Sequence, residues 1–248
     1  MGLYYRDDGI VLRTQDLGEA DRIVTVLTRR TGRVRAVGKG VRRTKSRFGA
    51  RLEPFTHVDL LLYAGRSNLD TVTQADSLRA YGAPLAADYP RYTAGVAMLE
   101  TAERFTPVEK EPALRQLLLL IGGLRALGDA EHASGLVLDA FLLRSLAVAG
   151  YAPALEECAR CGAPGKDRKL PAFAVAAGGM VCASCRPPGA ASPAAPTVAL
   201  MLALLRGDWD KADASERRHR VECSGLVAAY LQWHLEHSIR SLRHVERV

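Results

Sequence analysis

Apolar residues in the first third of the chain recur at every second position in short runs, several of them rich in β-branched residues. Turn-forming residues such as Thr31-Gly32 and Ala64-Gly65 separate these runs. The pattern predicts five strands, at residues 4–12, 23–28, 33–37, 55–63 and 69–78. Five short strands with a long loop before the fourth favour a small closed Greek-key barrel of the OB type, although an SH3-like barrel has the same number of strands.

The apolar period changes to that of a helix from residue 90 onwards. Helices are expected at residues 90–105, 113–127, 132–149 and 197–205, and from 224 to the C-terminus. The helix at 132–149 is apolar around much of its circumference, which predicts burial between neighbouring helices. One stripe of the last helix carries Leu226, Tyr230, Trp233 and His237.

These patterns together predict an α+β multidomain protein. We expect a five-stranded OB-type β-barrel at residues 1–80 and an α-helical domain formed by residues 81–153 and 191–248. A cysteine-bearing module at residues 154–190 interrupts the helical domain before the C-terminal helices, and a proline-rich stretch at 187–196 connects it to them.

Four of the five cysteines form two pairs with the spacing of metal-binding knuckles. Cys158 and Cys161 are separated by two residues, as are Cys182 and Cys185. Such pairs present four thiolates to one ion, which completes a closed tetrahedral zinc site of the structural kind. The alternatives are a redox pair, which needs only one such motif at the start of a helix, or two disulfides. For Cys223 we prefer a partly buried apolar residue to a fifth ligand.

Positive charge is concentrated near the N-terminus. The formal net charge is +7, and residues 1–80 carry 15 Lys and Arg against 9 Asp and Glu, a net charge of +6. Eleven basic residues and no acidic residue lie between Arg22 and Leu52. A segment with charge of one sign attracts polyanions, and we prefer this interpretation to that of a merely solvated face.

The loop at residues 38–48 gathers the groups that suit phosphate contacts. Its glycines permit sharp turns, and its arginines and lysines are donors to phosphate oxygens. Phe48, Phe55 and Tyr63 are candidates for base stacking, but we expect most of these rings in the barrel core. The candidate DNA-binding residues of the loop are Lys39, Arg42, Arg43, Lys45 and Arg47, and strand alternation adds Arg33 and Arg35.

The sequence contains no recognised catalytic motif, and we expect that the protein is not an enzyme. Between Gly32 and Gly38 lie five residues where a Walker motif has four, and Gly40 stands where that motif has Ser or Thr. No apolar run is long enough to span a membrane, and the first residues lack the pattern of a signal peptide. We therefore expect a cytoplasmic protein.

Several blocks of the sequence occur in a fixed order: Asp8–Leu12, Gly18–Val24, Thr28, Gly32, Lys39-Gly40, Arg42-Arg43, Lys45–Arg47, Leu52–Phe55 and Gly178–Cys182. These blocks resemble the RecO family of recombination mediators. The resemblance is most specific at residues 8–55 and continues through the helical middle to the four cysteines, where it points to the zinc-bearing branch.

This resemblance implies an OB-fold, a helical domain and a zinc module. It also implies binding to single- and double-stranded DNA, annealing of complementary strands, and partnership with RecR. With RecR, such a protein helps RecA onto DNA coated by single-strand-binding protein, and it would work at the nucleoid. The family's basic pattern transfers DNA contact to Lys39, Arg42, Arg43, Lys45 and Arg47, but not to other positions.

Two other functions are compatible with the residues. An OB barrel with a zinc knuckle also suits an RNA-binding module, and an active site without a known motif would make the chain an enzyme. A second basic array for annealing is a further hypothesis for the C-terminal part, at Arg217, Arg218, Arg220, Arg240, Arg243 and Arg247.

Overall fold

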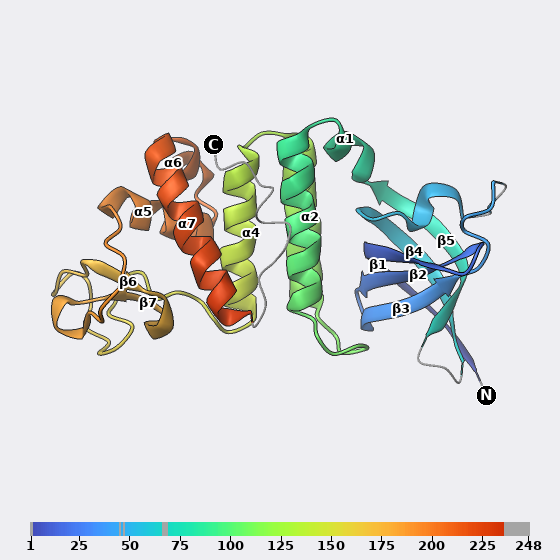
Figure 1. Cartoon of the computed structure of the whole chain (residues 1–248), viewed down its shortest axis with the longest axis horizontal. Helices are drawn as coiled ribbons and strands as arrows, with labels where there is room; N and C mark the ends of the chain where they lie inside the picture. The colour runs from blue at the N-terminus through green and yellow to red at the C-terminus, as the bar shows by residue number, and fades with distance from the viewer. Residues whose placement is uncertain (1, 45, 47, 66–68, 236–248) are drawn as a thin grey trace. The chain divides into compact units, whose positions relative to one another are not determined.

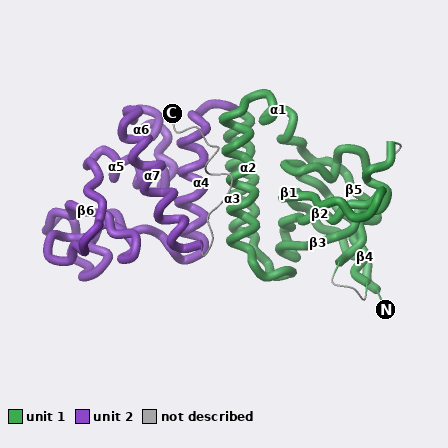
Figure 2. Tube along the Cα trace, viewed as in Figure 1, with its two compact units in different colours: residues 1–129 green, residues 130–248 purple. Residues whose placement is uncertain are grey.

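The computed structural model describes residues 2–44, 46, 48–65 and 69–235. The chain divides into two compact units, Met1–Asp129 and Ala130–Val248 (Figure 2). The helices that directly follow the barrel therefore belong to the same unit as the barrel. The domain boundary near residue 80, inferred from the change of period, stays a prediction.

The first unit contains a closed five-stranded barrel (Figure 1). The strands join in the order β1-β2-β3-β5-β4, and β4 also pairs with β1. Only the β3–β5 pair is parallel, and this pairing closes the barrel through Ala36 and Val37. This arrangement confirms the OB-type prediction. The strands are β1 (Leu3–Leu17), β2 (Asp21–Thr28), β3 (Gly32–Gly38), β4 (Thr56–Ala64) and β5 (Asp70–Ala80).

Strand β1 is longer than predicted. Residues 3–10 pair with β4 and residues 9–17 pair with β2, and the register of the second pairing shifts between Val11 and Arg13. Residues 13–17 are largely polar and exposed, so they carry no apolar alternation that could identify a strand. Backbone pairing with β2, and not side-chain burial, extends β1 to Leu17.

The barrel core is built from inward-facing strand residues and from the loop between β3 and β4. Along β3 buried and partly exposed positions alternate without a break, as expected for a strand with one face to the core. The loop adds Val41, Phe48 and Leu52, and the last of these lies in the 3-10 helix η1 (Gly49–Leu52). The loop is therefore fixed at both ends by the core that it covers.

Three helices complete the first unit: α1 (Gly82–Ala86), α2 (Tyr89–Arg104) and α3 (Leu114–Asp129). The Asp88 side chain accepts a hydrogen bond from the backbone N–H of Arg91 and caps α2. The Phe55 ring packs against α2 at Gly95, where a Cβ would lie 2.9 Å from Cε1 of that ring. This close approach joins α2 to the barrel.

The second unit consists of α4 (Ser134–Val148), the hairpin β6 (Ala172–Ala174) and β7 (Gly179–Val181), α5 (Ala195–Arg206), α6 (Trp209–Asp213) and α7 (Arg217–His234). Helix α4 is buried on most of its circumference, which confirms its prediction as an enclosed helix. None of the helices in the described ranges is long and apolar enough to cross a membrane.

Helix α7 begins at Arg217, earlier than the predicted residue 224. The prediction missed the first two turns because they are largely polar and carry no apolar period. Leu226 and Tyr230 are buried as the predicted stripe requires, whereas Trp233 is 62% exposed. His237, the last member of that stripe, lies outside the described residues. Helix α6 was not predicted, since five residues are too short to show a period.

Two adjacent aspartates fix the turn between β2 and β3. Asp7 is buried and accepts hydrogen bonds from the backbone N–H groups of Arg30 and Thr31 and from the Thr31 hydroxyl. Asp8 accepts two hydrogen bonds from the Arg29 guanidinium, at 2.7 and 3.0 Å, and contacts Nε2 of His57 at 3.0 Å. The hydrogen bonds from Arg29 lower the pKa of the Asp8 carboxyl below its usual 3.8.

The Asp8 contact predicts a pH-dependent loss of stability in an Asp8→Asn variant. A lowered pKa means that the ionised carboxylate stabilises the fold fully above the unfolded-state pKa of about 4, and that this contribution is lost progressively as the pH falls from there through the lower pKa of the folded state. We expect Asp8→Asn to lower the free energy of unfolding by about 1 kcal/mol at pH 7 and by less at pH 3. Urea unfolding at both pH values measures the difference. Asp76→Asn, at an exposed carboxylate of β5, is the control, and an equal loss at pH 7 and pH 3 would contradict the assignment.

Candidate metal centre and candidate nucleic-acid interface

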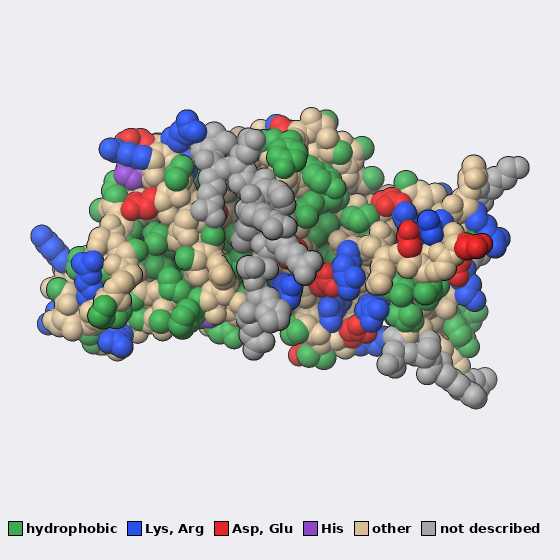
Figure 3. All heavy atoms as spheres, in the orientation of Figure 1, with side chains coloured by type: hydrophobic (Ala, Val, Ile, Leu, Met, Phe, Trp, Pro, Cys, Tyr) green, Lys and Arg blue, Asp and Glu red, His purple; other side chains and the backbone are tan. Residues whose placement is uncertain are grey.

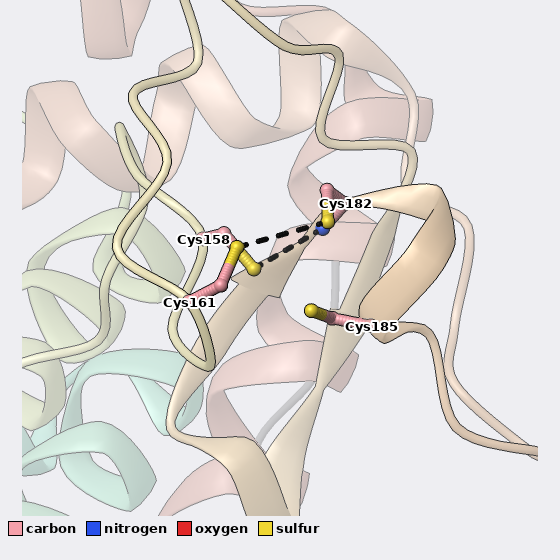
Figure 4. Close-up of side chains that lie close together, drawn as sticks. All are labelled: Cys158, Cys161, Cys182 and Cys185. Carbon is pink, nitrogen blue, oxygen red and sulfur yellow. Dashed lines mark hydrogen bonds between the residues drawn. The ribbon is translucent and has the colours of Figure 1, made fainter.

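The four paired cysteines converge on one point in the second unit (Figure 4). Their Sγ atoms all lie within 4.8 Å of one another, and those of Cys161 and Cys182 are 4.0 Å apart. Metal–sulfur bonds of about 2.3 Å in a tetrahedron place sulfur atoms about 3.8 Å apart. The group is therefore positioned to bind a metal ion.

The first knuckle is shaped by backbone hydrogen bonds. The N–H of Gly162 donates to the carbonyl of Cys158, and the N–H of Cys158 donates to the carbonyl of Ala163. Gly162 has a φ of 70°, a conformation that favours glycine. The N–H of Ala159 donates to the carbonyl of Met180, which ties this knuckle to the edge of the β6–β7 hairpin.

The second knuckle directly follows strand β7. Cys182 is the residue after the strand, and Cys185 ends the 3-10 helix η3 (Ala183–Cys185). The hairpin that delivers it pairs Phe173 with Met180. The core beneath consists mainly of small side chains and is too small to hold three-residue strands on its own. A metal ion bound by the four thiolates would supply the missing cross-link.

The described cysteines are all free thiols, so the two-disulfide alternative is not what the structure shows. Cys223 lies apart from the four-cysteine group and is completely buried, as expected for an apolar residue. Burial raises the pKa of its thiol well above the usual value. Cys223 is therefore no fifth ligand.

Polar neighbours favour the thiolate form of Cys158 and Cys182, whereas the contacts of Cys185 with Cys182 and Cys161 raise the pKa of Cys185 to about 12. The backbone N–H of Cys182 donates to Sγ of Cys158 at 3.4 Å, and this N–H together with that of Cys161 lowers the pKa of Cys158 to about 6. The guanidinium of Arg168 donates to Sγ of Cys182 at 3.8 Å. A four-thiolate site carries excess negative charge when it holds a divalent ion, and Arg168 offsets part of it.

The cysteine module is anchored to helix α7 by Tyr230. The Tyr230 ring meets the Phe173 ring edge to face at a centroid distance of 5.7 Å. Its hydroxyl donates to the carbonyl of Gly178, which lies between the hairpin strands. Tyr230 thus links the folding of the module to the helices of the second unit.

In the first unit, the loop between β3 and β4 exposes the described basic residues Lys39, Arg42 and Arg43. The N–H of Gly40 donates to the Asp21 carboxylate at 2.8 Å, and the N–H of Arg42 donates to the carbonyl of Ala20. Val41 and Phe48 point into the core, whereas Lys39 and Arg43 are exposed. The loop is thus a fixed scaffold for its cations.

The predicted DNA-binding residues fall into three groups. Lys39 and Arg43 form no ion pair within the part of the chain that the structure describes, whereas the exposed Arg42 pairs with Asp16 at 3.4 Å. Lys45 and Arg47 lie outside the described residues. The third group, Arg33 and Arg35, lies on β3, where Arg33 pairs with Glu103 and Arg35 with Glu109 at 3.6 and 3.7 Å.

Much of the basic segment is neutralised by acidic residues from other parts of the chain. Arg33, for example, has a side chain that is only 15% exposed and also donates to the carbonyl of Pro107. Among the described residues between positions 22 and 52, the following basic side chains form ion pairs with carboxylates: Arg22, Arg29, Arg30, Arg33, Arg35 and Arg42. The field of this surface is therefore weaker and more localised than the sequence alone indicates.

The three candidate stacking rings do not form a platform together. Phe48 and Phe55 are buried, in agreement with the expected core positions. Tyr63 is half-buried and lies beside the exposed Tyr4, with ring centroids 5.0 Å apart. Sequence reasoning missed Tyr4 as a neighbour of Tyr63, and only the β1–β4 register could have revealed it.

The hypothesis of a second basic array at the C-terminal arginines is weakened where the structure describes them. Arg218 pairs with Glu216, and Arg220 donates to Ser215 and to the carbonyl of Asp213. Arg217 is exposed at the start of α7. The remaining three predicted members, Arg240, Arg243 and Arg247, lie outside the described residues.

Two family models match the sequence one after the other. The one described as Recombination protein O N terminal matches residues 1–81, and the one described as Recombination protein O C terminal matches residues 86–243. The boundary between them falls close to the end of the barrel.

Similar proteins align over almost the whole chain. A DNA repair protein RecO from Thermobifida fusca is 74% identical over 243 residues, which cover 98% of each chain. Proteins of the same name from Frankia casuarinae and Streptomyces griseus are 63% and 62% identical and cover 98% of this chain and 98% and 99% of their own.

The convergence of the four thiols predicts one metal ion per chain. We expect Cys182→Ser to lose most of this metal and to unfold at a lower temperature, because three thiolates bind a structural ion less tightly and the module core is small. Elemental analysis of the purified protein and thermal unfolding measure both effects. Cys223→Ala is the matched control and should keep its metal, so equal metal content in the two variants would contradict the site.

Proposed function

The chain belongs to the RecO family of recombination and DNA repair proteins, and on this premise we propose that it binds single- and double-stranded DNA and anneals complementary strands. With RecR, it would help RecA onto DNA coated by single-strand-binding protein. The observation that supports this proposal best is the OB-type barrel with a core-anchored loop whose cations face outward. RecR, RecA and single-strand-binding protein are inferred from family membership.

The loop surface suits contact with a nucleic-acid backbone. Lys39 and Arg43 are exposed and free of ion pairs within the described ranges, so a phosphate has no carboxylate to displace from them. Binding of this kind releases counterions and depends on salt, but does not depend on base sequence. A mediator that must accept any strand needs such sequence-independent binding.

We expect the other predicted basic residues to contribute unequally to DNA binding. Arg42 would exchange Asp16 for phosphate, and Lys45 and Arg47 extend the same loop. A contact with Arg33 or Arg35 would require their ion pairs with Glu103 and Glu109 to open. We therefore assign a smaller contribution to these two strand residues.

We propose zinc as the ion held by Cys158, Cys161, Cys182 and Cys185. Four thiolates match the preference of zinc and leave no open coordination position, so the ion would hold the fold of the module and take no part in chemistry. We assign no catalytic role to any residue. Because the proposed substrate is chromosomal DNA, we propose that the protein acts at the nucleoid in the cytoplasm.

Strand annealing tests this function. Complementary oligonucleotides coated with single-strand-binding protein should anneal faster with the protein present, without nucleotide, and the acceleration should decrease as salt is raised. An RNA pair of the same sequence serves as the comparison. A preference for RNA, or no binding to DNA with or without RecR, would contradict the proposal.

The loop assignment predicts the effect of removing its two unpaired cations. Lys39→Ala with Arg43→Ala should weaken binding to all DNA sequences about equally and reduce the slope of log affinity against log salt by about 1.5 to 2. Arg115→Ala with Arg125→Ala, at exposed positions of α3, removes the same charge elsewhere. Fluorescence anisotropy at several salt concentrations measures both variants, and equal slopes for the two would contradict the loop assignment.

A further inference from the structure

The cysteine module carries basic side chains that form no ion pair with its own carboxylates. Residues 154–190 contain five basic residues and three acidic residues, Glu156, Glu157 and Asp167, and Glu156 pairs with Arg206 instead. None of these five basic side chains forms an ion pair with a carboxylate within the described part of the chain, unlike the arginines of strands β2 and β3. Figure 3 shows Lys and Arg side chains, and no Asp or Glu, on the visible face of the hairpin region. The five are Arg160, Lys166, Arg168, Lys169 and Arg186.

Two of the five side chains are already engaged within the module. Arg168 donates to Sγ of Cys182, and Arg186 donates to the carbonyl of Ala190 and to the hydroxyl of Ser192. The other three, Arg160, Lys166 and Lys169, are exposed and make no side-chain hydrogen bond among the described residues. These three residues, the module cations, are available to a ligand.

The backbone that carries the module cations is fixed. Arg160 lies inside the first knuckle, between Cys158 and Cys161. Lys166 and Lys169 lie on the turn that follows, where the N–H groups of Asp167 and Arg168 donate to the carbonyl of Pro164. The N–H of Gly165 donates to the carbonyl of Glu156, which closes the segment on itself. The cysteine group therefore determines where Arg160 is presented, and the turn after Pro164 fixes the backbone of Lys166 and Lys169.

The surroundings of the module cations indicate the chemistry of their ligand. Protein–protein interfaces have an apolar or aromatic centre, and the exposed neighbours here are small residues such as Gly162, Pro164 and Gly189. A group of lysine and arginine side chains without an apolar centre suits a phosphodiester backbone, because this backbone carries one negative charge per nucleotide. Annealing also requires that two strands be neutralised at once.

We propose that the module cations Arg160, Lys166 and Lys169 form a second phosphate-binding surface for a DNA strand, separate from the barrel loop. This inference rests on the proposed function, because it assigns a role to a second strand during annealing. It also gives the metal a purpose beyond stability, since the ion would hold a binding surface in place.

The test is a triple variant of the full chain, Arg160→Gln, Lys166→Gln and Lys169→Gln. For single-stranded DNA, the slope of log affinity against log salt should fall by about 2, at about 0.7 for each lost contact. Annealing of uncoated complementary oligonucleotides should slow by a larger factor than binding of one oligonucleotide weakens. Metal content and the thermal unfolding temperature should stay at wild-type values, because none of the three side chains makes a contact that holds the module.

The matched control is Arg104→Gln, Arg115→Gln and Arg125→Gln, which removes the same charge from exposed helical positions of the first unit. An equal loss in both triple variants would mean an effect of net charge alone and would overturn the inference. The inference would also be overturned if the module variant kept the wild-type salt slope and annealing rate while the Lys39→Ala, Arg43→Ala variant was impaired. In that case the proposed function stands. Loss of binding to polyglutamate with DNA binding intact would assign the surface to an acidic protein segment instead. If the wild-type chain binds no DNA, the proposed function and this inference both fall.

Discussion

The insertion of Phe48 into the barrel core is the contact on which the candidate DNA surface depends. A loop as long as the one between β3 and β4 would otherwise lose much conformational entropy in presenting its cations at fixed positions. Burial of Val41, Phe48 and Leu52 offsets that cost, and the hydrogen bond from Gly40 to Asp21 fixes the start of the loop. Lys39 and Arg43 are thereby exposed on a surface that the hydrophobic core has already ordered.

The cysteine module is also ordered before it binds a partner, but there the four converging thiols take the place of a hydrophobic core. Its strands are three residues long and its interior is largely alanine, so apolar burial contributes little. Four converging thiols allow one ion to cross-link two knuckles and a hairpin. Tyr230 then transmits this order to helix α7. In both units the candidate binding surface is a basic loop held by a rigid element beneath it.

Charge pairing separates the basic residues that build the fold from those that remain available. Arg29 and Asp8 fix a turn of the barrel, and Arg33 reaches Glu103 on α2. Each such ion pair reduces the positive field of the barrel surface but also fixes the shape of that surface. The cations that remain unpaired are therefore fewer but are held at defined positions. For binding that must be reversible and independent of sequence, a small number of unpaired cations on a fixed loop is sufficient.

Local patterns in the sequence were enough to predict five barrel strands, the enclosed helix α4 and the shared site of the two cysteine pairs, and they favoured the OB type over an SH3-like barrel without excluding the latter. Each of these follows from a local period or a fixed spacing, which nearby residues specify. The sequence by itself did not determine that β1 extends to Leu17, that α7 starts at Arg217, or which arginines are paired. These features depend on partners distant in sequence, such as Glu103 for Arg33, and on backbone hydrogen bonds that leave no apolar pattern. Only the tertiary structure could decide them, because it alone brings these partners together.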